Sequence, residues 1–192
     1  MGQLSREQID GMGFAKVGKN VMISDRASFY NCAGISIDNN VRIDDFCVLS
    51  AGVGGIRIGN YVHIAVYSSL IGAGKITLSD FTNISSRASI YSSNDDYSGR
   101  TMTNPMVPPK FRGVVHANVF LGKHVIIGSG SVILPGVTLE DGVAVGALSL
   151  VQRDCTAFGI YAGVPARRLK DRQRELLRLE KKFMEDHNNQ EY

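Results

Sequence analysis

The sequence of 192 residues contains no tryptophan, and only 8% of its residues are aromatic, although 44% are hydrophobic in total. No stretch approaches the roughly 18 uninterrupted apolar residues that a membrane-spanning helix requires. Residues 1–10 also lack the apolar core of a secretory signal. These absences predict a cytoplasmic protein without membrane insertion.

A strong charge of one sign and clustered cysteines are also missing. The chain carries 21 Lys and Arg against 18 Asp and Glu, a formal net charge of +3, which is too small to predict a nucleic-acid partner. The cysteines Cys32, Cys47 and Cys155 stand far apart, each in an apolar stretch. We expect them to be buried thiols, and we predict neither a disulfide framework nor a zinc knuckle.

The chain is rich in glycine, with 21 residues, and it contains a repeat with a period of six residues. An aliphatic residue recurs at every sixth position, and a small or β-branched residue follows it four places later. The aliphatic positions are Leu121, Ile127, Ile133, Leu139, Val145 and Val151. Neither the helical period of 3.6 nor the strand period of 2 sustains so many matches in this register, so the pattern predicts a hexapeptide β-solenoid.

The first half of the chain shows the same repeat with interruptions. Extra residues enter after Phe29, Leu49, Leu70 and Ile90, which each close a set of three hexads. A triangular coil of about eighteen residues explains this spacing, because every insertion then falls on one edge of a prism. We therefore predict an all-β solenoid, a parallel β-helix of about six triangular coils, over residues 17–164. Narrow aliphatic coils with tight corners account for the many glycines and the few rings.

Three further segments complete the predicted organisation. Residues 1–16 are an N-terminal lead-in. Residues 94–120 are an extended loop whose length is typical of ligand-binding arms, and Tyr97 and Phe111 are rings that the loop could offer to an acceptor. Residues 165–192 are predicted to be a C-terminal helix and tail, because apolar residues recur near helical spacing after Pro165.

Three stretches carry a resemblance to a known family: LGKHVIIGSGSVILPGVTL (Leu121 to Leu139), VAVGALSLV (Val143 to Val151) and YAGVPARRL (Tyr161 to Leu169). They resemble the left-handed β-helix hexapeptide-repeat acyltransferases, close to the sugar O-acetyltransferases and nucleotide-sugar N-acetyltransferases of polysaccharide biosynthesis. The resemblance implies left-handed coils, a homotrimer, acetyl-CoA as the donor and active sites between subunits. It also implies a saccharide or nucleotide-sugar acceptor.

The resemblance assigns five residues to coenzyme A. Ser129 and Ala147 follow Gly128 and Gly146, where family members offer backbone groups to the pantetheine arm. Three arginines match positions whose cations can meet the phosphates of coenzyme A, and a guanidinium suits phosphate oxygens well. These arginines are Arg153, Arg167 and Arg168. The alternative is that they form a solvated basic start to the C-terminal helix.

Acetyl transfer to a hydroxyl needs a base, and histidine is the natural base near neutral pH. Galactoside and xenobiotic relatives carry a catalytic histidine at a position that here holds Asn94 or Asp95, so this chain departs from the family. His63 is the leading substitute, because the period places it in an outward polar ladder with Arg42 and Asn83. Its alternative role is that of a surface or trimer-packing histidine.

Other side chains remain open as the base. His116, at the end of the long loop, is the second histidine candidate, whereas His124 occupies an outward repeat position and is expected to be solvated. Asp95 and Asp96 could orient a histidine or bind sugar hydroxyls, although adjacent acids also form turns.

Asn83 could donate a hydrogen bond to an oxyanion or to a sugar hydroxyl. Since an amine needs a weaker base than a hydroxyl does, the acid pair leaves both acceptor chemistries open.

The function predicted from these features is acetyl transfer from acetyl-CoA to a sugar hydroxyl in surface-polysaccharide assembly. N-acetylation of a nucleotide-linked amino sugar is the alternative, and a non-catalytic scaffold is a remote one. A zinc site like that of the γ-class carbonic anhydrases is not expected, because His116 and His124 are eight residues apart and His63 lies in another column. No metal requirement is predicted.

Overall fold

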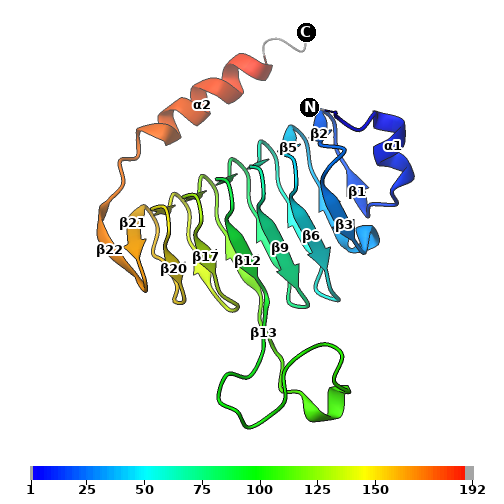
Figure 1. Cartoon of the computed structure of the whole chain (residues 1–192). Coiled ribbons are helices and arrows are strands. Elements are labelled where there is room, and N and C mark those ends of the chain that lie inside the picture. Colours follow the sequence, from blue (N-terminus) through cyan, green and yellow to red (C-terminus); the bar gives the residue numbers. More distant parts are fainter. Residues whose placement is uncertain (1, 189–192) are drawn as a thin grey trace.

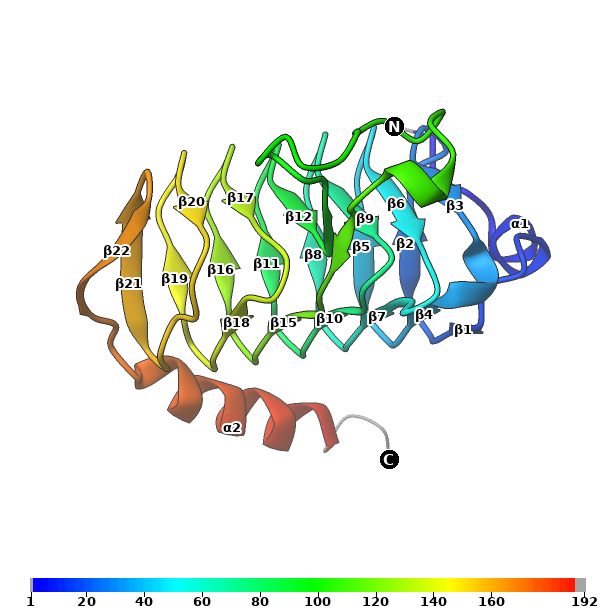
Figure 2. The same cartoon turned by 90° about the horizontal axis from the view of Figure 1, so that it is seen from below.

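The computed structural model describes residues 2–188 of the chain, and side chains as far as residue 186. It shows a parallel β-helix preceded by α1 (Arg6–Gly11) and followed by α2 (Glu175–Asn188), which runs back beside the coils (Figures 1 and 2). Within the described residues, no helix is long and apolar enough to cross a membrane.

Three parallel sheets form the sides of the prism. The first sheet contains β1 (Lys16–Val17), β4 (Ile35–Ile37), β7 (Ile56–Ile58), β10 (Ile76–Leu78), β15 (Val119–Leu121) and β18 (Thr138–Leu139). The second contains β2 (Val21–Ile23), β5 (Val41–Ile43), β8 (His63–Ile64), β11 (Asn83–Ile84), β16 (Ile126–Ile127), β19 (Ala144–Val145), β21 (Gly159–Gly163) and β22 (Ala166–Asp171). The third contains β3 (Ser28–Tyr30), β6 (Val48–Ala51), β9 (Ser69–Gly72), β12 (Ser89–Tyr91), β17 (Val132–Ile133) and β20 (Leu150–Val151).

The hexads stack in the predicted register. Ile84 pairs with Ile64 on one side and with Ile127 on the other, and all three side chains are fully buried. This stack of aliphatic side chains fills the prism and supplies most of its stabilisation, because each buried isoleucine contributes about 1.5–3 kcal/mol relative to exposure. The prediction of an all-β solenoid is confirmed.

Six coils are complete, as predicted, and the chain adds part of a seventh. Cys155 bridges to Leu139 of the first sheet, and β21 pairs with β19 of the second. The predicted insertions also lie together, since each enters between a strand of the third sheet and the next strand of the first sheet. The longest of them, residues 94–120, projects from the prism after β12 (Figure 1).

Cys47 and Cys155 are buried, as the sequence predicts, and burial raises the pKa of each thiol to about 11. Cys32 is only half-buried and is the first residue of the short 3₁₀ helix η1 (Cys32–Gly34). No disulfide joins the three cysteines.

The prediction that the C-terminal helix begins soon after Pro165 is wrong. Residues 166–171 form β22, which folds back antiparallel to β21, and α2 starts only at Glu175. The orphan edge of β21 explains the difference, because an unpaired parallel edge strand gains a full row of backbone hydrogen bonds from β22. The end of the predicted tail, beyond residue 188, lies outside the described residues.

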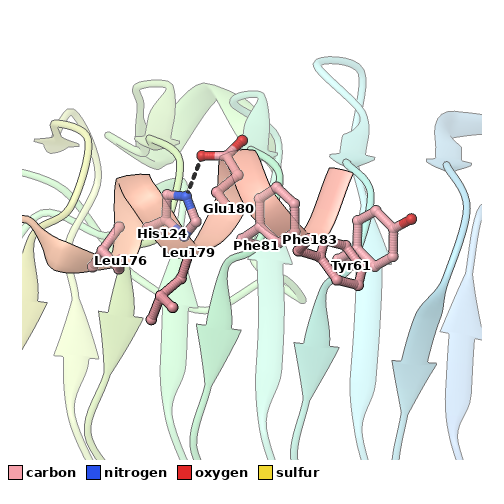
Figure 3. Close-up of a pocket in the computed structure, with 7 residues that line it drawn as sticks. All are labelled: Tyr61, Phe81, His124, Leu176, Leu179, Glu180 and Phe183. Atoms are coloured by element: carbon pink, nitrogen blue, oxygen red, sulfur yellow. Dashed lines mark hydrogen bonds and ion pairs between the residues drawn. The ribbon is translucent and has the colours of Figure 1, made fainter. Parts of the chain in front are cut away.

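Helix α2 is held against one corner of the prism by a stack of three rings. Tyr61, Phe81 and His124 stack with centroid separations of 5.0 and 4.8 Å, and Phe183 of α2 meets Tyr61 edge-on at 5.2 Å (Figure 3). Leu176, Leu179 and Glu180 line the remaining hollow beside these rings (Figure 3). The expectation that His124 is solvated is therefore wrong.

Glu180 provides the polar part of this attachment. Its carboxylate accepts hydrogen bonds of 2.7 Å from both Lys123 Nζ and His124 Nε2. Burial alone would raise the pKa of Glu180, but the hydrogen bonds and charges of His124 and Lys123 outweigh burial and leave the pKa below its usual value. The attachment therefore stabilises the fold above the unfolded pKa of about 4.3 and weakens as the pH falls through the lower folded value.

We expect Glu180→Gln to loosen α2 at pH 7. Backbone amides of the helix should exchange with deuterium about tenfold faster, which corresponds to the loss of one charge-assisted hydrogen bond. Glu185→Gln is the matched control, since the exposed carboxylate of Glu185 reaches only Lys181 among the described residues, at 4.0 Å. Equal exchange in both variants would show that the rings alone hold the helix.

Candidate active site

The predicted polar ladder exists on the outer face of the second sheet. His63 pairs in register with Arg42 on one side and Asn83 on the other. The ring atom Nδ1 of His63 lies 3.2 Å from Asn83 Oδ1, and Nε2 lies 2.9 Å from Asp44 Oδ2. The sequence thus identified three members of this cluster.

Asp44 is the member that sequence reasoning missed. It accepts hydrogen bonds from Arg42 Nε at 2.7 Å as well as from His63, and only 11% of its side chain is exposed. Burial would raise the pKa of this carboxyl, but His63 and Arg42 outweigh burial and lower it. The sequence contained a signal for Asp44, because the corresponding positions of the next coils hold the small residues Ala65, Ser85 and Gly128. A carboxylate in a column of small residues is an exception that could have pointed to a polar contact.

This cluster limits what His63 can do. Both ring nitrogens face oxygen acceptors, so the ring directs no free lone pair toward a substrate while Asn83 stays in place. His63 could serve as a base only if an acceptor displaced Asn83 from Nδ1. The arrangement resembles a carboxylate that orients a histidine, which is chemically useful for a hydroxyl acceptor.

The base of the long loop is a short antiparallel pair, β13 (Ser93–Asn94) with β14 (Val115–His116). Ser93 Oγ accepts a hydrogen bond from the backbone N of Ala73 at 2.7 Å and lies 2.7 Å from His116 Nδ1. The loop thereby holds His116 on a separate part of the prism from the His63 cluster, and Asp95 follows directly after β13.

The two adjacent acids of the loop have different surroundings. Asp96 accepts hydrogen bonds from the backbone N of Ser98 at 2.8 Å, and from the backbone N and the hydroxyl of Thr101 at 3.0 and 3.1 Å. These bonds, chiefly those of Ser98, lower the pKa of Asp96 to about 2. Asp96 is therefore occupied in forming the loop, which is the turn-forming alternative raised by the sequence.

Asp95, by contrast, is exposed and makes no hydrogen bond or ion pair with any residue of the described chain. It lines a hollow of about 390 Å³ together with Asp96, Tyr97, Arg100 and Val115. Tyr97 is 87% exposed there, and its role toward an acceptor stays a prediction. The hollow combines a free carboxylate with an exposed ring, which are the groups that an amino sugar can use.

We expect Asp96→Asn to disorder this loop without touching the prism. The amides of Ser98 and Thr101 should exchange with deuterium about tenfold faster, because the amide replacement weakens charge-assisted hydrogen bonds. Asp95→Asn is the matched control, and it should leave this exchange unchanged. Slow exchange in the Asp96→Asn variant would mean that other contacts order the loop.

Ser129 and Ala147 stack on consecutive coils at the corner between the second and third sheets. Both residues are exposed, and the backbone N of Leu148 donates to Ser129 O at 2.9 Å. The preceding glycine allows this close stacking, since a Cβ on Gly128 would lie 2.4 Å from Ala147 N. The corner is therefore an exposed surface on which two consecutive coils stack closely.

The three arginines assigned to coenzyme A are exposed on the last coils but on different sheets. Arg153 follows β20 of the third sheet, whereas Arg167 and Arg168 lie on β22, opposite Ala162 and Tyr161. Arg168 also forms an ion pair with Asp171. The alternative that Arg167 and Arg168 begin the terminal helix is wrong.

Among residues 2–188, no three His, Cys, Asp or Glu side chains gather as metal ligands would.

A β-solenoid of hexad coils with a polar loop at one edge defines the class of protein: the chain belongs to the hexapeptide-repeat sugar acyltransferases with a left-handed β-helix. It is 58% identical over 183 residues to the dTDP-4-amino-4,6-dideoxy-D-glucose acyltransferase of Escherichia coli, covering 95% of each chain. No family model matches the sequence.

A solved structure has nearly the same fold. AntD of Bacillus cereus, an N-acyltransferase in complex with dTDP and 3-hydroxybutyryl-CoA, superposes with a TM-score of 0.93 at 46% identity, covering 97% of this chain and 98% of AntD. A more distant relative is WbbJ of E. coli K12, described as a putative lipopolysaccharide O-acetyl transferase, with 27% identity over 179 residues, 82% of this chain and 88% of that protein.

Proposed function

We propose that the protein transfers an acyl group from a coenzyme A thioester to the 4-amino group of a dTDP-linked 4-amino-4,6-dideoxyhexose. The observation that carries this proposal is the 58% identity, over nearly the whole chain, to an acyltransferase of that sugar. AntD supports it, because an AntD variant was solved with dTDP-4-amino-4,6-dideoxyglucose and coenzyme A. The alternative considered from the sequence, N-acylation, thus replaces O-acetylation as the first choice.

Asp95 is the group that we assign to the amine. A free carboxylate in an exposed hollow can accept hydrogen bonds from the ammonium group and then take the proton that the nitrogen loses. Once one ammonium proton is on Asp95, the nitrogen lone pair attacks the thioester carbonyl and the C–N bond forms. The C–S bond then breaks, and the sulfur takes the second proton lost by the nitrogen, so that coenzyme A leaves as the thiol.

Ser85 is our choice for the group that meets the developing oxyanion. It lies one residue beyond Ile84, beside the His63 cluster, and its hydroxyl makes no hydrogen bond within residues 2–188. A hydroxyl that is free in the resting protein can donate to charge that appears only in the transition state. Asn83, on the strand β11 that precedes Ser85, is the second donor available, although it is engaged by His63.

Acyl-CoA binding is assigned to the corner of Ser129 and Ala147, with Arg153, Arg167 and Arg168 as cations for the phosphates. We further propose a homotrimer in which the long loop of one subunit completes the site of the next. The loop exposes Met106 and Tyr97 almost fully, at 88% and 87%, and such apolar surface is usually covered in an assembly.

O-acetylation remains the second candidate. It is favoured by the similarity to WbbJ and by the Asp44–His63 pair, because a hydroxyl, unlike an amine, needs a histidine-like base. Under this alternative the acceptor hydroxyl would replace Asn83 at His63 Nδ1.

The product distinguishes the two candidates. Wild-type protein is incubated with acetyl-CoA or 3-hydroxybutyryl-CoA and dTDP-4-amino-4,6-dideoxyglucose, and the product is treated with alkaline hydroxylamine, which cleaves esters but not amides. We expect a product that survives this treatment, with one thiol released per acyl group transferred. A hydroxylamine-sensitive product would instead support O-acetylation, and no product with either donor would contradict both.

A further inference from the structure

Arg112 is a half-buried cation without a partner. Its Nε is fully removed from solvent and has no hydrogen-bond partner, and the guanidinium forms no ion pair with any residue in the described part of the chain. Leaving a partly buried guanidinium unpaired costs free energy, and an anion bound against it would offset that cost.

The backbone holds Arg112 in a defined place. Residue 112 follows the short 3₁₀ helix η2 (Pro109–Phe111), its backbone N donates to Pro109 O at 3.1 Å, and it bridges to Met102 across the loop. The side chain is therefore directed by an ordered turn within the loop.

His116 adds a second donor to the same hollow. Ser93 Oγ accepts a hydrogen bond from Ala73 N and lies 2.7 Å from His116 Nδ1, so this contact fixes the imidazole ring. Nε2 of His116 has no partner within residues 2–188, and it carries an N–H when Nδ1 accepts the hydrogen of the Ser93 hydroxyl. Arg112 and His116 thus both present nitrogen atoms that lack a partner in the described chain.

The segment from Arg112 to His116 separates two hollows that differ in their carboxylates. Arg112, Val114 and His116, with Pro109, line a hollow of about 360 Å³ that contains no carboxylate. The alternate residues Gly113 and Val115 line the hollow that holds Asp95, Asp96 and Arg100. This alternation places a hollow without carboxylates and a hollow with two carboxylates and one guanidinium on opposite sides of one extended segment.

We propose that the hollow of Arg112 and His116 binds a phosphate group of a substrate. A guanidinium and an imidazole N–H match phosphate oxygens, and the carboxylates of the hollow next to them match an ammonium group. The inference rests on the proposed function, whose two substrates both carry phosphates. The source is either the diphosphate of the nucleotide sugar or a phosphate of coenzyme A.

Binding measurements on the full chain test the site. Dissociation constants for dTDP, for coenzyme A and for 3′-dephospho-coenzyme A are determined by titration calorimetry, without catalysis. Arg112→Gln should weaken the binding of the nucleotide or of coenzyme A by roughly 10- to 100-fold, the loss expected for charged hydrogen bonds. If only dTDP is affected, the source is the diphosphate. If coenzyme A is affected and the dephospho compound is not, the source is the 3′-phosphate.

Lys110→Gln is the matched control. This substitution removes the same charge from the same loop. The ammonium of Lys110 lies 4.9 Å from the centroid of the Phe111 ring and does not line the hollow. Its variant should bind every ligand within about threefold of wild type. Arg112→Lys, which keeps the charge but loses the planar guanidinium, should bind with intermediate affinity.

Two results overturn the phosphate site. One is that Arg112→Gln binds every ligand within about threefold of wild type, or that wild-type protein binds none of them. The other is that Arg112→Gln dissociates the assembly in sedimentation measurements while affinities stay unchanged, which would assign Arg112 to a contact between copies. The proposed function fails separately if the ligands bind in an Arg112-dependent way but no amide product forms.

Discussion

Asp95→Asn is expected to lower kcat/KM for the amino-sugar acceptor by about 100-fold or more, within the range found for lost general acid–base groups. The physical reason is that Asn cannot accept the proton that the amine loses, and it carries no charge to attract the ammonium group. Asp95 has no partner in the described chain, so its removal leaves no buried group unpaired. Steady-state assays of thiol release measure the effect, and circular dichroism should show an unchanged fold.

His63→Asn is the comparison that gives this prediction its meaning. His63 is engaged by Asp44 and Asn83, so we expect its replacement to lower kcat/KM less than tenfold with an amine acceptor. The opposite result, a large loss of kcat/KM in His63→Asn and a small loss in Asp95→Asn, would assign the chemistry to the His63 cluster on the second sheet. It would also favour the hydroxyl acceptor.

Ile127→Ala is expected to lower the free energy of unfolding by about 3 kcal/mol, as is usual when a fully buried isoleucine is replaced by alanine. Ile127 is 0% exposed and lies between Ile84 and Val145 in the aliphatic stack. A cavity at this point interrupts the contact between adjacent coils, on which a solenoid depends for its stability. Urea unfolding at one fixed protein concentration measures the change, because assembly makes stability depend on concentration.

Ile126→Ala supplies the matched control. Ile126 is the preceding residue of the same strand, carries the same side chain and points to the outer face, where it is half-buried. We expect its replacement to cost less than half as much as that of Ile127. Equal costs would contradict the register, since a shift of one residue would exchange the two faces.

The repeat could be predicted from the sequence because a solenoid is nearly one-dimensional. Each hexad contacts only the hexads above and below it, so the positions of Ile64, Ile84 and Ile127 follow directly from counting. The ladder of Arg42, His63 and Asn83 follows from the same arithmetic. The insertions, too, fall on one edge for this reason.

The parts that could not be predicted depend on contacts between coils and added segments. The partner of His124 is Glu180, which the fold brings back along the prism from far along the chain. Strand β22 forms because β21 leaves an open edge, and no local pattern in residues 166–171 predicts a strand there. The isolation of Arg112 depends on how the long loop turns, which has no repeat to follow.

The site itself shows the same division. Asp95 and Asp96 are adjacent and chemically alike, and only the hydrogen bonds of Ser98 and Thr101 distinguish the loop-forming acid from the free one. Likewise, the ladder alone left His63 free to act as a base, because its contact with Asp44 was not anticipated. The choice between amine and hydroxyl depends on this distinction, together with the relatives that the chain resembles.

The most direct test of the account is the ratio of kcat/KM for two acceptors that differ only at C4, dTDP-4-amino-4,6-dideoxyglucose and dTDP-6-deoxyglucose. A site built to bind an amine rejects the hydroxyl analogue strongly, since its carboxylate then lacks the ammonium partner. We predict a preference for the amine of at least about 100-fold, lost on Asp95→Asn. A ratio near one, or a preference for the hydroxyl, would contradict the proposed function.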